Sequence, residues 1–281
     1  MTRTLPPSIR AIAVAACLAI AAPVQARAQG LGLPDYAATI EARPVAGLAR
    51  NLSGLTYSDA SGTLFAAVNR PAALAELSLD GRLLRHVPLP AGWDAEGVAH
   101  LEADLFIIAD EAGNRLHWVR VPPGGGAAIH EGSISLRPGW ITWPNRGFEG
   151  VEWDRRRAEL LIVNEKWPRK VLLVGGLGRA GAAPEITVRD WWPVRGAEAI
   201  GSDLASLAVH EDSGNLLLLS EESARITEYT RAGALASMLA LTAGAAGLAR
   251  DVPQPEGMAV GPDGAIYVVS EPNLFYRFSK E

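Results

Sequence analysis

Carboxylates recur in this chain at the borders of apolar segments that are typical of buried strands. Glu149 lies between Phe148 and Gly150 at the start of one such segment, and Glu165 follows the next one. A charged side chain is costly to bury without a partner, so its repetition at equivalent places indicates a shared role. Seven glutamates occupy these two kinds of position: Glu96, Glu149 and Glu256 before a strand, and Glu111, Glu165, Glu221 and Glu271 after one.

Carboxylates gathered in one place have a definite chemistry. Like charges a few ångströms apart in a partly desolvated site cannot all stay ionised, so some pKa values rise or a cation binds. The chain has one cysteine, Cys17, and its five histidines show no pair at zinc-type spacing. Oxygen ligands alone favour a hard cation, and Ca²⁺ accepts about 6–8 oxygens where Mg²⁺ demands stricter octahedral geometry. We therefore predict Ca²⁺ as the divalent cation bound by these glutamates, and neither zinc nor haem.

The elements that must position these glutamates form an internal repeat. Gly54, Gly97, Gly150, Ser206 and Gly257 fall in register, 43, 53, 56 and 51 residues apart. Around each of them lies an apolar strand, a turn and a second apolar strand, in the segments 51–70, 94–111, 147–165, 203–222 and 254–271. Further strand candidates follow, such as 73–89 with a hairpin turn at Asp80-Gly81, and 225–241.

Strand pairs that repeat about every 50 residues, without amphipathic helices between them, predict an all-β fold of four-stranded blades arranged as a β-propeller. Strands that are apolar on both faces fit this architecture, because each blade is packed between two others. The fifth unit supplies only three strands, ending at 273–278, and the N-terminal segment 38–47 is expected to close the ring as the fourth. We predict five blades, or six if two units have been merged; a β-sandwich would not explain the repeat.

The propeller places the glutamates on one rim. In an up-and-down blade, the first strand starts where the second one ends, so both positions face the same mouth of the central channel. The first position reads Ser53, Glu96, Glu149, Ala205 and Glu256, and the second reads Arg70, Glu111, Glu165, Glu221 and Glu271. Two alternatives compete with a cation site: the glutamates cap the tight strand starts, or they form ion pairs with Arg50, Arg70, Lys166 and Arg169.

The N-terminus predicts export. Residues 1–28 carry basic residues, then an apolar stretch, and end in Ala26-Arg27-Ala28, which suits a secretory signal cleaved after Ala28. Lipidation at Cys17 and an uncleaved anchor are the alternatives. The remaining residues 29–281 are expected to form a single propeller domain in the periplasm or outside the cell. A membrane would be contacted only through such an N-terminal anchor.

Charge and motifs exclude several partners. Without the signal the chain has 23 basic and 31 acidic residues, a net charge of −8, which argues against nucleic acid. The segment 176–181 reads GLGRAG, but Pro184 and a strand-like run follow it instead of the helix that a dinucleotide site needs, so we expect no nucleotide. The aromatic residues Trp140 and Trp143 suit either ligand stacking or packing between blades, and packing is favoured. His100 and His210 are expected to be satisfied core residues.

The repeats also resemble a known family. The segments NLSGLTY, WDAEGVAHL, GFEGVEWD and above all VPQPEGMAVGPDGAIYVVSEPNLFYRF are similar to the SdiA-regulated, or YjiK-like, family of bacterial proteins. The resemblance implies an envelope β-propeller, with calcium-related roles attributed to some relatives. It places the family's acidic positions at Glu96, Glu149 and Glu256 and at Glu111, Glu165 and Glu271. The fourth repeat departs from the family, with Ala205-Ser206 where relatives more typically have Ser-Gly.

Three functions follow as hypotheses. The first is an envelope binding protein whose acidic channel mouth holds Ca²⁺ and which acts in binding, sensing or scaffolding, with a small molecule or a protein as ligand. The alternative is a metal-dependent esterase, lactonase or phosphoesterase, in which a divalent ion at the mouth activates the substrate or water. A third hypothesis, a protein-interaction platform, would show as an exposed aromatic patch around Trp140.

Overall fold

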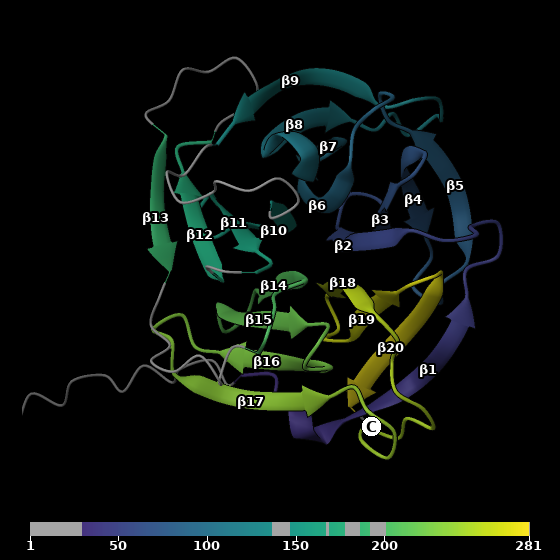
Figure 1. Ribbon diagram of the computed structural model, residues 1–281, viewed down its shortest axis with the longest axis vertical. Coiled ribbons are helices and arrows are strands. Elements are labelled where there is room, and N and C mark those ends of the chain that lie inside the picture. Colours follow the sequence, from purple (N-terminus) through teal and green to yellow (C-terminus); the bar gives the residue numbers. More distant parts are fainter. Residues whose placement is uncertain (1–29, 137–146, 167–168, 178–185, 192–200, 281) are drawn as a thin grey trace, which may run out of the picture.

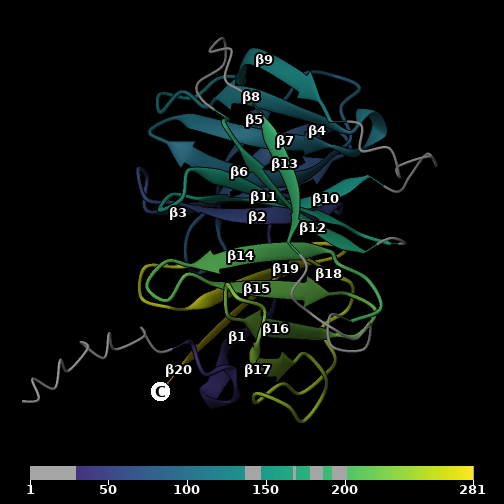
Figure 2. The same cartoon turned by 90° about the vertical axis from the view of Figure 1, so that its left-hand side faces the viewer.

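Five antiparallel sheets of four strands each surround a common axis in the computed structural model, which describes residues 30–136, 147–166, 169–177, 186–191 and 201–280 (Figure 1). The β-propeller prediction and the count of five blades are confirmed. Figure 2 shows the same ring from the side, with the sheets stacked across the disc. Among the described residues, no helix has the length and apolar character needed to cross a lipid bilayer.

Each blade is a meander whose first strand lies nearest the axis. The blades are β2 (Leu52–Ser58), β3 (Thr63–Asn69), β4 (Ala72–Leu77) and β5 (Leu83–Pro88); β6 (Ala95–Glu102), β7 (Leu105–Asp110), β8 (Arg115–Arg120) and β9 (Ile129–Ser135); β10 (Phe148–Asp154), β11 (Glu159–Asn164), β12 (Lys170–Gly175) and β13 (Thr187–Trp191); β14 (Ser206–His210), β15 (Asn215–Ser220), β16 (Arg225–Tyr229) and β17 (Leu235–Ala240); and β18 (Pro255–Val260), β19 (Ile266–Ser270), β20 (Leu274–Lys280) and β1 (Tyr36–Pro44). Two short 3₁₀ helices complete the described elements: η1 (Leu33–Asp35) and η2 (Glu111–Gly113).

The fifth blade closes the ring with strands from both ends of the chain. β1 pairs antiparallel with β20, from Tyr36 opposite Lys280 to Pro44 opposite Leu274. The predicted N-terminal closing strand is therefore confirmed, although it begins two residues before the expected segment. Pairing β1 to the last blade covers the edge that β20 would otherwise expose.

The hydrophobic core is divided among the five gaps between blades. Successive residues of an inner strand point to opposite faces, so alternate side chains enter the two gaps that flank the strand. On β6, Val98 packs with Phe65 and Phe106 toward the first blade, whereas Ala99 packs with Val151 and others toward the third. The continuous apolar runs of the sequence follow from this arrangement, because both faces of the strands are covered.

The register glycines are required by the close approach of the inner strands. A Cβ atom added at Gly97 would lie 2.5 Å from the backbone oxygen of Glu149 in the next blade, and one at Gly54 would lie 2.6 Å from the backbone oxygen of Glu96. Neighbouring backbones leave no room for a side chain there. In the fourth blade Ser206 takes this position, and its Oγ accepts a hydrogen bond of 3.2 Å from the backbone N–H of Met258.

Some sequence predictions fall outside the described residues. The signal segment 1–28, Trp140 and Trp143, and most of the glycine-rich segment 176–181 belong to this group. His100 is confirmed as a satisfied buried residue: it is 2% exposed, and its Nε2 lies 2.9 Å from the carbonyl oxygen of Ala103. His210 is partly buried, with its Nδ1 2.8 Å from Ser213 Oγ.

Candidate cation site in the channel mouth

All seven predicted glutamates line one cavity of about 330 Å³ at one end of the axial channel. The structure thus brings together residues that are up to 175 positions apart in the chain, from Glu96 to Glu271. Arg70 is the one basic side chain among the described residues that line this cavity. The complete lining consists of Ser53, Asn69, Arg70, Asp94, Glu96, Glu111, Glu149, Glu165, Asp203, Ala205, Glu221, Glu256 and Glu271.

Backbone irregularities turn the first ring of glutamates toward the axis. In β6 the pairing passes from Ala95–Asp110 to Gly97–Ala109, so Glu96 is an extra residue in a β-bulge. The same shift surrounds Glu256 in β18 and occurs between Phe148 and Val151 in β10, the stretch that contains Glu149. A regular strand would direct these side chains into the gaps between blades, whereas a bulge re-aims them.

Two aspartates join the glutamates that the sequence predicted. Asp94 and Asp203 both line the cavity. Each stands three residues before its register position, Gly97 and Ser206 respectively. This shared spacing is the signal that could have identified them, but neither residue flanks an apolar strand directly, which was the pattern used to select the glutamates.

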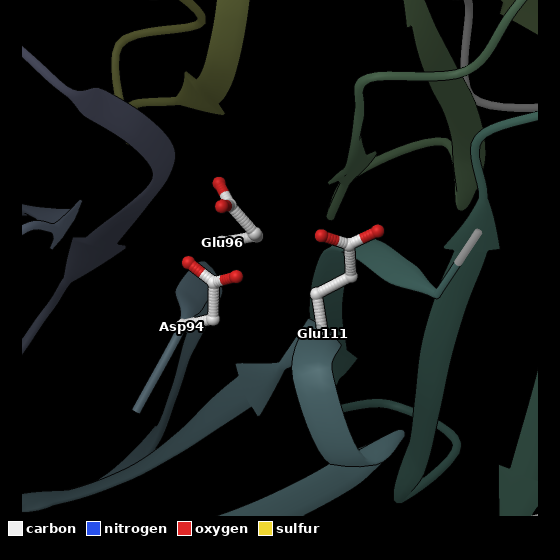
Figure 3. A group of neighbouring side chains, drawn as sticks. All are labelled: Asp94, Glu96 and Glu111. Carbon is white, nitrogen blue, oxygen red and sulfur yellow. The ribbon is translucent and has the colours of Figure 1, made fainter. Parts of the chain in front are cut away.

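Three carboxylates converge most closely. One oxygen each of Asp94, Glu96 and Glu111 lie within 4.8 Å of one another, and Figure 3 shows the three side chains pointing into a common space. Two oxygens on one Ca²⁺ can be at most about 5.2 Å apart, because each Ca–O distance is about 2.3–2.6 Å. The spacing of these three oxygens is therefore compatible with a shared metal ion.

The hydrogen bonds of this group leave one buried oxygen unpaired. Glu96 accepts hydrogen bonds from the hydroxyl of Ser53 and from the amide of Asn69, the latter at 2.8 Å. Glu111 accepts a longer one, 3.3 Å, from the backbone N–H of Gly147. Asp94 Oδ1 is buried and has no hydrogen-bond partner. A buried carboxylate oxygen without a donor is a place where a cation would be stabilised.

A polar network behind the cavity holds Asp94 and the segment around it. Asp110 accepts a hydrogen bond of 3.1 Å from the backbone N–H of Asp94, and its other oxygen lies 3.3 Å from His117 Nε2. Trp93 stacks on the His117 ring at 3.7 Å. Burial opposes ionisation of Asp110, but the hydrogen bonds from His117 and Asp94 hold its pKa below the ordinary value. His117 also approaches His130, a proximity that the sequence spacing did not reveal.

The deepest glutamates have no compensating partner. No described residue donates a hydrogen bond to the carboxylates of Glu149 or Glu256. Burial, reinforced by Glu96, Glu111, Glu165 and Glu256, raises the pKa of Glu149 well above its ordinary value. Burial also raises the pKa of Glu256 to about 8, with further contributions from Glu221, Glu96, Glu271 and Glu165. The mouth is therefore a region in which negative charge accumulates and is poorly neutralised.

Three further glutamates, Glu96, Glu111 and Glu221, show the same tendency more weakly. Burial raises the pKa of Glu96, although its hydrogen bonds to Ser53 and Asn69 oppose the rise. Burial and then the nearby Glu96, Asp94 and Glu165 raise the pKa of Glu111, against the hydrogen bond from Gly147. Burial and Asp203 raise the pKa of Glu221.

Capping of strand starts and ion pairing, the two alternatives to a cation site, account for only some of these carboxylates. Lys166 pairs with Glu165 at 3.0 Å, and the exposed Arg70 lies 3.6 Å from Asp94. Arg169 instead donates to the carbonyl oxygen of Gly201. Backbone capping is found at Asp203, which accepts from the N–H groups of residues 221 and 222 and from a serine hydroxyl. Neither role explains the three glutamates that precede the register glycines.

Comparison with known proteins agrees with the fold. A family model described as SdiA-regulated matches residues 28–279. Glutaminyl cyclase from Myxococcus xanthus superposes with a TM-score of 0.59 at 15% identity, covering 85% of this chain and 94% of that one. Virginiamycin B lyase from Staphylococcus aureus reaches a TM-score of 0.45 at 14% identity, covering 86% and 73% of the two chains. At 15% identity the likeness to the glutaminyl cyclase shows the propeller fold alone.

Proposed function

Because the chain belongs to the SdiA-regulated family, we propose that it is a bacterial envelope propeller that binds Ca²⁺ in its acidic channel mouth. In this role the ion, held by the protein, forms part of a binding surface at the end of the channel. The function is binding, sensing or scaffolding, and the partner is a small molecule or a protein segment that reaches the mouth.

The observation that supports this proposal is the convergence of Asp94, Glu96 and Glu111. Their oxygens lie within 4.8 Å of one another, and one buried oxygen of Asp94 has no donor. The donor set consists of carboxylates, the ligand type that Ca²⁺ prefers over softer alternatives. Glu149 and Glu256 supply further negative charge in the same cavity, so a divalent cation would relieve repulsion as well as fill its coordination sphere.

A bound ion would leave room for a ligand. The cavity of about 330 Å³ is several times the roughly 30 Å³ occupied by one water molecule, so an ion fills only a part of it. Ca²⁺ usually keeps some ligand positions for water or for carbonyl and carboxylate oxygens of a partner. We therefore expect the ligand to present oxygen atoms, since the surrounding glutamates repel an anion that does not contact the ion.

Calorimetric titration of metal-stripped protein with Ca²⁺ tests the proposal. We expect one saturable binding event, weakened at least tenfold by Glu96→Gln or Glu111→Gln. Glu102→Gln is a matched control, because Glu102 ends the same strand at the opposite face of the disc and is exposed. Absence of binding heat, together with an unchanged melting temperature in Ca²⁺, would reject the proposal. Mg²⁺ in place of Ca²⁺ is expected to bind more weakly, because Mg²⁺ demands near-ideal octahedral geometry and Ca²⁺ accepts a more flexible one.

The envelope location is a separate part of the proposal. Cleavage after Ala28 would leave Gln29 as the first residue. Mass spectrometry of the protein isolated from a periplasmic extract checks this directly. A mass that includes residues 1–28, or a lipid attached at Cys17, would contradict cleavage and support one of the anchored alternatives.

The properties of Glu149 favour a second candidate function, metal-dependent hydrolysis of an ester or phosphoester. This carboxylate lines the cavity, has no hydrogen-bond donor among the described residues, and has a raised pKa, as a general base requires. The cation would polarise a substrate oxygen, while Glu149 would accept the proton of the attacking water. A screen of generic esters and phosphoesters with Ca²⁺ discriminates: turnover lost in Glu149→Gln supports the enzyme, and no turnover supports the binding protein.

A further inference from the structure

A second and larger cavity, of about 500 Å³, lies at the other end of the axial channel. It is formed by the ends of inner strands, by the turns that follow them, and by residues next to the two ends of the described chain, among them Tyr36 and Lys280. Its lining includes Tyr57, Asp59, Glu152, Trp153, Arg155 and Glu211. None of its lining residues belongs to the acidic mouth, so the two cavities are separate sites at opposite faces of the disc.

Glu152 occupies an unusual place in this second cavity. It lies on β10 two residues after Gly150, so both face the fourth blade. The positions two residues after the other register residues are Thr56, Ala99, Ala208 and Ala259. Glu152 is therefore the single carboxylate at this level of the ring, in a place where other inner strands carry small side chains.

The other carboxylates that line the cavity are already paired with cations. Asp59 and Glu211 lie 3.1 and 3.5 Å from Arg155, and Asp212 lies 3.8 Å from Arg156. Asp263 lies 3.1 Å from Arg277, and Asp154 lies 3.0 Å from Arg157. Glu152 alone has neither an ion pair nor a hydrogen bond with any residue that the structure describes.

Arg155 does not fill this gap, because its guanidinium is committed elsewhere. Besides Asp59 and Glu211, it donates to His100 Nδ1 at 2.7 Å and to the carbonyl oxygen of Leu101 at 3.2 Å. Burial lowers the pKa of His100, and Arg155 lowers it further, so this ring is neutral and accepts the hydrogen bond. Four groups therefore orient the guanidinium, and Glu152 is not one of them.

We propose that this second cavity binds a small organic molecule carrying an ammonium group, which pairs with Glu152. An ammonium group supplies both the hydrogen-bond donors and the positive charge that this carboxylate lacks. Tyr57 and Trp153, both partly buried, line the same cavity and offer apolar and π surface to the rest of the molecule. A metal ion fits less well, since the neighbouring carboxylates are held by arginines.

Proton release accompanies this binding. Burial raises the pKa of Glu152 to about 8, with Glu211 and Asp154 adding to the rise and Arg155 opposing it. At pH 7 the carboxyl is mostly protonated, and an ammonium group stabilises the ionised form. Binding at pH 7 thus releases about one proton, because a group with a pKa one unit above the pH is roughly 90% protonated.

The test is calorimetric titration at pH 7 with phenethylammonium and butylammonium, compared with 2-phenylethanol and butanol. We expect the ammonium compounds to bind, the alcohols to bind at least tenfold more weakly, and Glu152→Gln to weaken ammonium binding at least tenfold. Glu102→Gln is the matched control, because Glu102 is exposed at the end of β6 and lines neither cavity, and it should bind as wild type. Titrations with and without Ca²⁺ should agree, since the two cavities are separate.

Wild-type protein alone also tests the proposal, and this test does not depend on whether the variant folds. Titration in two buffers of different ionisation enthalpy, neither a primary amine, should give heats that differ by release of about one proton. Ammonium binding without proton release, equal affinity for ammonium and alcohol, or no binding of any ammonium compound would overturn the proposal. Unchanged affinity in Glu152→Gln would do so as well.

Discussion

Replacing Glu256 with Gln should stabilise the metal-free protein at alkaline pH. The folded protein raises the pKa of Glu256 to about 8, from an ordinary value of 4.5, mainly through burial. A carboxyl with a raised folded-state pKa binds its proton more tightly when folded. Below pH 4.5 the carboxyl is protonated in both the folded and the unfolded protein, so it does not destabilise the folded state. As the pH rises from 4.5 to 8, the folded state loses stability. Glutamine carries no charge and avoids this loss.

The size of the effect follows from the pKa. A rise from 4.5 to about 8 corresponds to about 5 kcal/mol at 1.36 kcal/mol per pKa unit. Because the side chain keeps some contact with solvent, we reduce the expectation to about 3 kcal/mol. For a chain of this length that corresponds to roughly 6–12 °C in melting temperature at pH 9.

Urea unfolding in EDTA, followed by tryptophan fluorescence, measures the difference. At pH 4.5 wild type and Glu256→Gln should agree within about 0.5 kcal/mol, and at pH 9 the variant should be more stable. Glu102→Gln, on the exposed end of β6, should show no such pH dependence. Saturating Ca²⁺ should stabilise the wild type more than the variant, because ligand binding to the folded state adds stability. Equal stability at pH 9, or a gain independent of pH, would refute the electrostatic reasoning.

Three further predictions concern the stability and closure of the propeller around the site. Gly97→Ala places a Cβ atom 2.5 Å from the Glu149 backbone oxygen and should cost about 2–3 kcal/mol in urea unfolding, whereas Gly124→Ala, with open space around it, should change stability by less than about 0.5 kcal/mol. Asp203→Ala leaves two backbone N–H groups and a hydroxyl without their acceptor, so a loss of about 2–3 kcal/mol is expected by the same measurement. Removing residues 30–44 uncovers the edge of β20, and light scattering should then detect association that the full chain lacks; a monodisperse truncated protein would contradict the role of β1 in ring closure.

The architecture was predictable because it is repetitive. Each blade repeats the same strand, turn and strand around Gly54, Gly97, Gly150, Ser206 and Gly257, so five weak local patterns reinforce one another. The need for glycine at four of these positions is visible only in the structure, where the next blade's backbone occupies the space of a Cβ atom. The sequence showed that these positions are equivalent but could not show what they contact.

The sequence was sufficient to predict which glutamates form the site, but not which groups they contact. Seven glutamates share two positions of the repeat, and all seven line one cavity. Asp94 and Asp203 were missed because each stands at the first residue of its repeat, two residues before the position that was compared. Glu152 was missed because it stands within a strand, where alternating polarity is ordinary and gives no sign that its neighbours around the ring are small.

Sequence by itself determined which residues are equivalent, and it predicted five or six such units with acidic residues gathered at one mouth. Tertiary structure decided which of those carboxylates have donors: Glu96 has two, Asp203 has three, and Glu149 and Glu256 have none among the described residues. The physical reason is distance along the chain. Neighbouring blades are about 40 to 60 residues apart in the chain, and glutamates that share the cavity are up to 175 residues apart. No local pattern of side chains therefore specifies their contacts, and only closure of the ring brings them together.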